Sequence, residues 1–242
     1  ISWVADQAEK DAERFRRIGV APEKVAVTGS VKFDVDIPED VRAAAMALRQ
    51  ELAGRPVWIA GSTHGSENDQ LLAAHGKVLA EHPGALLILV PRHPDRFEPV
   101  AEKAVKEGLT LARRSLGEGP AQAQVYLGDT MGELMMLYGA SDLAFVGGSL
   151  IERGGHNPLE PAGWGIPVFS GPHIFNFETI YQSLLNDRGV KLVTDADDLA
   201  AHLSSLFSDG QEREAIGQRA LEVVNKNRGA LDKVVDGIIE RV

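Results

Sequence analysis

From residue 57 to residue 193, short apolar segments alternate regularly with longer segments of helical character, and this alternation constrains the fold more than any other feature. The apolar segments are continuous, a pattern typical of strands buried on both faces of a sheet. The predicted strands are 57–60, 86–90, 110–112, 125–127, 143–146, 167–169 and 191–193. The predicted helices are 67–81, 95–108, 131–139, 158–164 and 177–186. We therefore predict an α/β fold with a Rossmann-like, doubly wound parallel sheet.

The segments on either side follow the same rules. Residues 2–5 are predicted to end a strand, residues 6–18 to form a helix, and residues 25–27 to form a second short strand. A helix is predicted from Pro38 to about Ala53. The last segment, 197–242, has the pattern of two or three closing helices.

Composition excludes several classes of function. A net charge of -10 and a pI near 5.2 argue against a nucleic-acid duplex or an anionic membrane as partner. The absence of cysteine removes disulfides, thiolate zinc sites and cysteine nucleophiles. The longest apolar run, Ala85 to Val90, is far shorter than the roughly 20 residues that span a bilayer. The first residues lack both a methionine and the features of a signal peptide, so we expect the chain to begin inside a longer protein.

Ligands of open α/β sheets bind at the carboxyl ends of the strands, where this sequence places its unusual residues. Arg92 directly follows a predicted strand, and its guanidinium suits a phosphate. The alternative is a salt bridge to Glu67 or Glu133. His93 and Arg96 either contact the ligand as well or only cap and orient the next helix.

A second such loop, 147–160, contains two glycine pairs and then the start of a predicted helix. Asn157 is a suitable N-cap, Pro158 suits the first helical position, and Glu160 stands where a capping box places its acid. Helix N-termini after glycine-rich loops commonly bind phosphate. The alternative is that these residues only make turns and caps. Thr130 and Glu133 predict another capping box, after the strand 125–127.

Other motifs are weaker. Asp34-Val35-Asp36 matches a short metal-binding pattern of some glycosyltransferases, but we interpret it as a solvated acidic turn. Ser149, His156 and Glu160 do not follow the pattern of a hydrolytic triad. The dinucleotide fingerprint and the Walker lysine loop are absent. The residues by themselves thus predict a Rossmann-like domain that binds a phosphorylated small molecule, a nucleotide, through helix N-termini and Arg92.

Several blocks of the chain also closely resemble one enzyme family, the 3-deoxy-D-manno-octulosonic acid (Kdo) transferases that act on lipid A precursors in Gram-negative bacteria. The blocks are GSVKFD at 29–34, GSTHGSE at 61–67, ILVPRHPDRF at 88–97, GDTMGEL at 128–134 and GGSLIERGGHNPLEPAGWGIPVFSGPHIFNF at 147–177. The resemblance implies the C-terminal, donor-binding half of a GT-B glycosyltransferase that transfers Kdo from CMP-Kdo. It implies a connector at 1–35, a CMP-Kdo-binding domain at 36–224 and a closing helix at 225–242. Two departures are His64-Gly65-Ser66-Glu67, where H-x-G-E is expected, and Asp95 in place of glutamate.

The resemblance also implies site residues. The implied CMP contacts are Pro91, Arg92, Met131, Gly132, Glu133, Asn157, Pro158, Leu159 and Glu160. Glu160 would accept hydrogen bonds from the ribose, Arg92 and the helix N-terminus at 131–133 would hold the phosphate, and Lys32 would stabilise charge in the transition state. The family's general base lies in the N-terminal half, so this chain should bind the donor without catalysing transfer.

Further expectations from the resemblance concern partners. The reaction would be an inverting displacement that needs neither a metal nor a cofactor. The lipid A precursor would be bound, and the cytoplasmic face of the inner membrane contacted, through the N-terminal half. Two alternatives remain open: a related GT-B enzyme that uses a UDP-sugar, and a non-catalytic nucleotide-binding module.

Overall fold

The structure is a computed structural model that describes residues 1–241 and divides into two compact units. Unit 1 comprises Ile1–Asp36 and the residues from Glu222 onward, and unit 2 comprises Ile37–Leu221. Helix α9 (Gly210–Lys226) contributes residues to both units. Within the described residues, no helix combines the length and the apolar character needed to cross a membrane.

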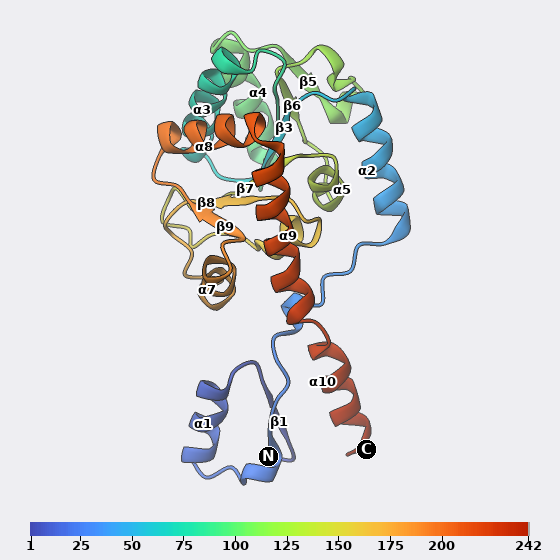
Figure 1. The fold of residues 1–242 in the computed structure, drawn as a ribbon, viewed down its shortest axis with the longest axis vertical. Helices are drawn as coiled ribbons and strands as arrows, with labels where there is room; N and C mark the ends of the chain where they lie inside the picture. The colour runs from blue at the N-terminus through green and yellow to red at the C-terminus, as the bar shows by residue number, and fades with distance from the viewer. Residues whose placement is uncertain (242) are drawn as a thin grey trace. The chain divides into compact units, whose positions relative to one another are not determined.

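Unit 2 contains the predicted alternation of strands and helices (Figure 1). Its strands are β3 (Val57–Thr63), β4 (Leu86–Pro91), β5 (Leu111–Arg113), β6 (Val125–Leu127), β7 (Leu143–Val146), β8 (Val168–Ser170) and β9 (Val190–Leu192). Its helices, besides the first part of α9, are α2 (Glu39–Glu51), α3 (Glu67–Glu81), α4 (Phe97–Lys106), α5 (Leu134–Gly139), α6 (Leu159–Gly163), α7 (Glu178–Asn186) and α8 (Ala196–Ser208). Short 3-10 turns lie at Pro94–Arg96, Arg114–Leu116 and Pro120–Gln122. Most elements lie within one to three residues of their predicted positions.

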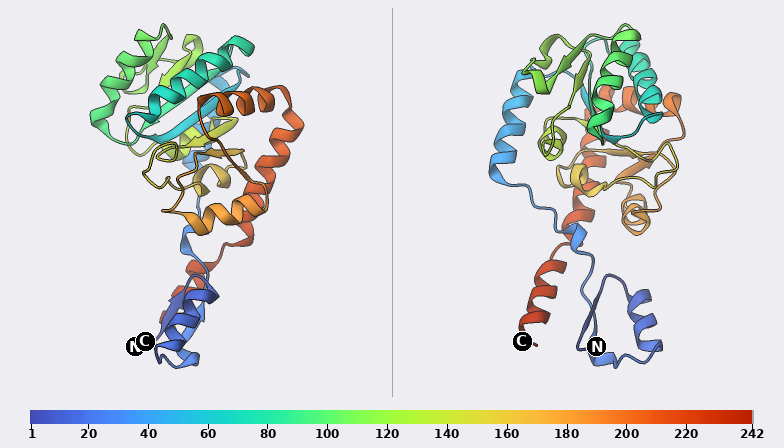
Figure 2. Two further views of the ribbon diagram at one scale, coloured as in Figure 1. Left: turned by 90° about the vertical axis from the view of Figure 1, so that its left-hand side faces the viewer. Right: turned by 180° about the vertical axis from the view of Figure 1, so that it is seen from behind.

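The seven strands of unit 2 form one parallel sheet in the order β5-β6-β4-β3-β7-β8-β9. Because consecutive side chains of a strand point to opposite faces, the central strand β3 supplies two cores. Trp58 and Ala60 pack with α3, α4 and α8, whereas Val57 and Ile59 pack with α2 and α5. Figure 2, in the view from behind, shows α2 on one side of the sheet and α3 with α8 on the other. The predicted doubly wound α/β fold is confirmed.

The strand order reverses at β3, which hydrogen-bonds to β4 on one side and to β7 on the other. From β3 the chain first adds β4, β5 and β6 on one side of β3. It then crosses to the other side of β3 and adds β7, β8 and β9 there. A reversal of this kind leaves a crevice at the carboxyl ends of the two strands where it occurs, here β3 and β7, and ligands of such sheets bind in that crevice. The loops after β3, β4 and β7 therefore meet at one place.

Unit 1 consists of β1 (Val4–Asp6) and β2 (Val25–Val27) in parallel, α1 (Glu9–Arg17), 3-10 turns at Pro22–Lys24 and Val31–Phe33, and α10 (Ala230–Ile239). Asp34 accepts hydrogen bonds from the backbone N–H groups of Gly229, at 2.6 Å, and Leu231, at 2.7 Å. This carboxylate caps the first turn of α10. The interpretation of residues 34–36 as a solvated turn was thus wrong for Asp34.

Candidate functional site

The loop after β7 lies directly on the end of β3. The backbone N–H of Gly147 donates to Gly61 O at 2.8 Å, and that of His156 donates to Gly147 O at 3.1 Å. A Cβ atom on Gly147 would lie 2.6 Å from the backbone oxygen of Ser62, closer than real Cβ atoms approach. Glycine at this position therefore permits the two loops to touch.

The second glycine pair of this loop is required for a different reason. Gly154 and Gly155 have φ angles of 83° and 71°, which side chains other than glycine rarely adopt. A Cβ on Gly154 would also lie 2.5 Å from the side chain of Asn176. Both glycines of this pair therefore stand where the chain adopts conformations that glycine alone takes up readily.

Glu67 joins the β3 loop to the β7 loop. Its buried carboxylate accepts hydrogen bonds from the backbone N–H groups of Gly148 at 2.8 Å, Ser149 at 3.0 Å and Leu150 at 3.0 Å. The N–H of His64 donates to the same carboxylate at 3.3 Å. Burial raises the pKa of Glu67, and the backbone N–H donors oppose that rise. Glu67 therefore positions backbone, and it is not the salt-bridge partner of Arg92 that the sequence left open.

Three histidines gather at the same edge of the sheet. The Nε2 atoms of His64 and His156 are 2.8 Å apart and their rings are stacked with an interplanar angle of 5°. His93 approaches His64 edge-on with ring centroids 5.5 Å apart. Burial lowers the pKa of His156 to about 4, and burial followed by the charges of His93 and Arg153 lowers that of His64. Both rings are therefore neutral near pH 7, and one donates a proton to the other's lone pair.

Arg92 follows the last residue of β4, the buried Pro91, as predicted. Its backbone N–H donates to Thr63 O at 2.9 Å, while its side chain is exposed. Among residues 1–241, no carboxylate forms an ion pair with Arg92. The charge of Arg92 contributes to lowering the pKa values of His156 and Glu160, so it lies near both groups.

The segment 157–160 ends the β7 loop and begins α6. Asn157 Oδ1 accepts a hydrogen bond from the N–H of Leu159 at 3.1 Å. Pro158 is the residue before the helix, which starts one residue later than predicted, at Leu159. Burial raises the pKa of Glu160, opposed by a hydrogen bond from Asn157 and by the charge of Arg92. The carboxylate of Glu160 is thus a half-buried acceptor beside a cation.

The segment 131–133 differs from its prediction. Helix α5 begins at Leu134, and Gly132, with a φ of 82°, belongs to the turn before it. Thr130 donates its hydroxyl to the Glu133 carboxylate and does not cap a helix. The predicted helix N-terminus at 131–133 was therefore wrong, because the glycine turn delays the helix. These residues still follow β6, the neighbour of β4.

Glu133 has a partner that the sequence did not suggest. Arg114 donates from Nε and Nη2 to the two carboxylate oxygens of Glu133 at 2.6 and 2.5 Å. This two-pronged contact lowers the pKa of Glu133. Glu133 is therefore occupied and is not available to pair with Arg92.

Ser149 has a structural role. Its side chain is fully buried, donates to Val146 O at 2.7 Å and accepts from the N–H of Gly171 at 2.7 Å. Its hydroxyl connects the ends of β7 and β8 and has no histidine partner among residues 1–241. Ser149 therefore belongs to the scaffold of the loop.

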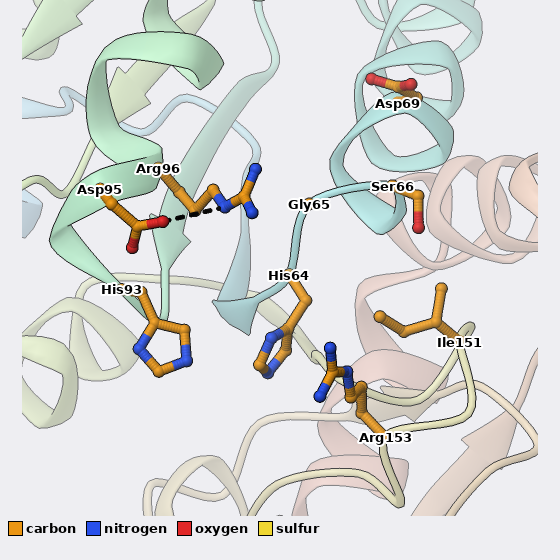
Figure 3. Close-up of a pocket in the computed structure, with 9 residues that line it drawn as sticks. All are labelled: His64, Gly65, Ser66, Asp69, His93, Asp95, Arg96, Ile151 and Arg153. Atoms are coloured by element: carbon orange, nitrogen blue, oxygen red, sulfur yellow. Dashed lines mark ion pairs between the residues drawn. The ribbon is translucent and has the colours of Figure 1, made fainter.

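A pocket of about 490 Å³ opens between the loops that follow β3, β4 and β7 (Figure 3). Its lining residues are His64, Gly65, Ser66, Asp69, His93, Asp95, Arg96, Ile151 and Arg153. This lining includes His93 and Arg96, which the sequence left open, but none of the residues predicted to contact CMP. The pocket lies beside that predicted set, since His64 is hydrogen-bonded to His156, the neighbour of Asn157.

Sequence reasoning missed Arg153, Arg114 and the role of Glu67. Arg153 and Arg114 lie in polar loops where an arginine is unremarkable, and Glu67 opens a helix, where an acid is common. No local pattern distinguishes them, because their partners are remote in sequence. Lys32, the predicted catalytic residue, is an exposed residue of unit 1, in the turn Val31–Phe33.

Comparison with known proteins points to one family. Residues 1–35 match the family described as 3-deoxy-D-manno-octulosonic-acid transferase (kdotransferase). The chain is 43% identical to the 3-deoxy-D-manno-octulosonic acid transferase of Haemophilus influenzae over 98% of its own length and 56% of that protein. It is 34% identical to the Bordetella pertussis protein of the same name, over 97% of the chain and 55% of that protein. The chain thus spans about half the length of the curated relatives it matches.

The chain is also similar to a solved structure. The C-terminal CMP-Kdo binding domain of WaaA from Acinetobacter baumannii is 36% identical and superposes with a TM-score of 0.74. The match covers 77% of this chain and 99% of that domain.

Proposed function

The chain belongs to the 3-deoxy-D-manno-octulosonic acid (Kdo) transferase family, and on that premise we propose that its unit 2 binds the nucleotide sugar CMP-Kdo. The observation that carries this proposal is the 36% identity to a CMP-Kdo binding domain of which the chain covers 99%. The crevice beside β3, towards which the loops with Arg92 and residues 157–160 converge, supports it independently.

The proposed CMP site comprises the residues that the resemblance implies: Pro91, Arg92, Met131, Gly132, Glu133, Asn157, Pro158, Leu159 and Glu160. Arg92, which has no carboxylate partner among the described residues, would hold the phosphate. Glu160, a half-buried acceptor beside the charge of Arg92, would accept hydrogen bonds from the ribose hydroxyls. Backbone donors in the turn 131–133 would contribute to the phosphate site.

The proposed reaction is a direct, inverting displacement at the anomeric carbon of Kdo. The acceptor hydroxyl oxygen forms a bond to that carbon, the bond from the carbon to the phosphate oxygen of CMP breaks, and its electron pair leaves with CMP. Negative charge therefore grows on the phosphate, so donors already fixed around it stabilise the transition state more than the ground state. Arg92 would supply that stabilisation, with Lys32 as a second cation.

For the whole protein we propose transfer of Kdo to a lipid A precursor at the cytoplasmic face of the bacterial inner membrane. The general base that takes the acceptor proton, the acceptor site and the membrane contact would come from the half of the family's length that this chain does not span. Within the chain, residues 1–35 would serve as connector, 36–224 as donor-binding domain and 225–242 as closing helix.

Calorimetric titration of the chain with CMP, with UMP as the control ligand, tests the proposal. Wild type should prefer CMP, and Arg92→Ala should weaken CMP binding by about 10- to 150-fold, the effect of losing a charge-assisted contact. Arg219→Ala is the matched control, because Arg219 donates to the backbone of Arg188, near the amino end of β9 and away from the strand ends that form the site.

Equal binding of CMP and UMP would favour an enzyme that uses a uridine nucleotide sugar. Absence of binding to both nucleotides would contradict the proposed site. Equal effects of Arg92→Ala and Arg219→Ala would mean that the phosphate lies elsewhere.

A further inference from the structure

The pocket between the loops after β3, β4 and β7 carries more positive than negative charge that is free to meet a ligand. Asp69 is 3.5 Å from Lys103, and Asp95 is 3.3 Å from Arg96, so both of its acids have a basic partner. Arg153 has no ion-pair partner among residues 1–241.

Arg153 and the histidines face the same space. In Figure 3 the guanidinium of Arg153 points towards the ring of His64, with His93 on the other side of that ring. The charges of His93 and Arg153 both act on His64. The exposed His93 imidazole and the Arg153 fork therefore both line this pocket and present hydrogen-bond donors on either side of His64.

This group is not the nucleotide phosphate of the proposed site. Arg92 and residues 157–160, the proposed holders of CMP, do not line the pocket, but they adjoin it through the hydrogen bond from His156 to His64. A ligand that places its nucleotide on one side of the His64–His156 pair can therefore place a substituent of its phosphate on the other. A substituent that meets Arg153 favourably has an anionic group of its own.

We infer that this pocket is the subsite for the carboxylate of the donor's sugar acid, with Arg153 and His93 as its donors. The inference rests on the proposed function, since it assigns a binding site to the sugar half of CMP-Kdo, the half that CMP lacks. Arginine presents two parallel N–H groups that match a carboxylate, whereas a neutral sugar would leave this cation unpaired. The pocket would thereby select nucleotide sugars that carry an acid at the anomeric end.

Titration of the chain with two ligands, CMP and freshly prepared CMP-Kdo, tests the inference. Arg153→Ala should lower the affinity for CMP-Kdo by about 10- to 150-fold, the effect of losing one charge-assisted contact, and leave the affinity for CMP unchanged. Arg153→Lys keeps the charge but loses the two-pronged geometry, so its loss should be smaller. Arg92→Ala should weaken the binding of both ligands.

Arg153 is exposed, and equal melting temperatures of wild type and variant would verify that Arg153→Ala folds. A loss of the same size for CMP and CMP-Kdo would overturn the inference, because the pocket would then hold the phosphate. Unchanged CMP-Kdo affinity in Arg153→Ala would overturn it too, since the carboxylate would lie elsewhere. Failure of the proposed function has a different signature, namely no preference of wild type for CMP over UMP.

Discussion

The buried carboxylate of Glu67 accepts a hydrogen bond from the backbone N–H of Ser149 at 3.0 Å, and this contact ties the start of α3 to the loop after β7. The neighbouring N–H groups of Gly148 and Leu150 point at the same carboxylate. Successive backbone donors of this kind form a nest that suits an anion. Here the protein fills the nest with its own side chain, and the loop that leads to His156 and Asn157 is fixed by it.

Glu67→Gln should destabilise the fold, because an amide brings an NH2 group towards backbone donors that need an acceptor. Loss of buried hydrogen bonds to a charged group should lower the free energy of unfolding by about 2 to 3 kcal/mol, measured by urea denaturation. Glu81→Gln is the matched control, since Glu81 is the exposed last residue of the same helix. Similar stabilities of the two variants would contradict the role given to Glu67.

Arg114→Ala should weaken CMP binding although Arg114 is not among the proposed CMP contacts. In the wild-type chain, Arg114 Nε donates to the Glu133 carboxylate at 2.6 Å. Removal of the guanidinium leaves this carboxylate as a negative charge without an ion-pair partner in the proposed phosphate site. We expect about a tenfold loss of CMP affinity in calorimetry, about 1.4 kcal/mol. The double variant Arg114→Ala, Glu133→Gln should recover part of that loss. No recovery would mean that the charge of Glu133 does not act on the ligand.

Stability should fall between pH 6.5 and pH 4 because of His75. Trp58 Nε1 donates to His75 Nδ1 at 3.1 Å, and the other ring nitrogen is 2.8 Å from Gln124 O, so the buried ring is neutral. Burial lowers the pKa of His75 from 6.5 to about 4. The unfolded chain therefore takes up the proton first as the pH falls, and the stabilisation present above pH 6.5 is lost on approach to pH 4.

The full loss from this one group is about 3 kcal/mol. Urea denaturation of wild type and His75→Gln at several pH values measures the contribution of His75 to this loss. Glutamine has an acceptor and a donor to replace the two hydrogen bonds of the ring, and it does not titrate. The stability of the variant should decline less steeply over this range. Parallel pH profiles would show that another group causes the decline.

Gly61→Ala and Gly76→Ala should have opposite effects. A Cβ on Gly61, in the middle of β3, would lie 2.1 Å from the hydroxyl of the buried Tyr138, so β3 or α5 must shift. Overpacking of this kind should cost about 1 to 3 kcal/mol. A Cβ on Gly76, inside α3, meets no atom within 4 Å. Alanine there should raise stability by about 0.5 to 1 kcal/mol. Thermal unfolding of the two variants compares them, and a stable Gly61→Ala would contradict the packing.

The positions of most strands and helices follow from local patterns. Leu143–Val146 and Val125–Leu127 are strands within their predicted bounds, because a short continuous apolar run with glycine next to its end is typical of a strand buried in a parallel sheet. The start of α5 was misplaced, since whether Thr130 caps a helix or bonds a side chain depends on the φ of Gly132. The loops chosen for the ligand follow from the rule for strand ends, which needs no strand order.

The contacts of the charged residues depend on the strand order, which no local pattern reveals. Placing β3 between β4 and β7 brings Glu67 against a backbone more than 80 residues away, and His64 against His156. The sequence predicted that Arg92 contacts either a phosphate or one of two acids, Glu67 and Glu133. Both acids have other partners: Glu67 accepts from backbone N–H groups, and Glu133 pairs with Arg114. A chain encodes its elements locally through side-chain periodicity. The hydrogen-bond and ion-pair partners of its buried charged side chains are determined only by tertiary packing, which brings donors from distant parts of the sequence within hydrogen-bonding distance.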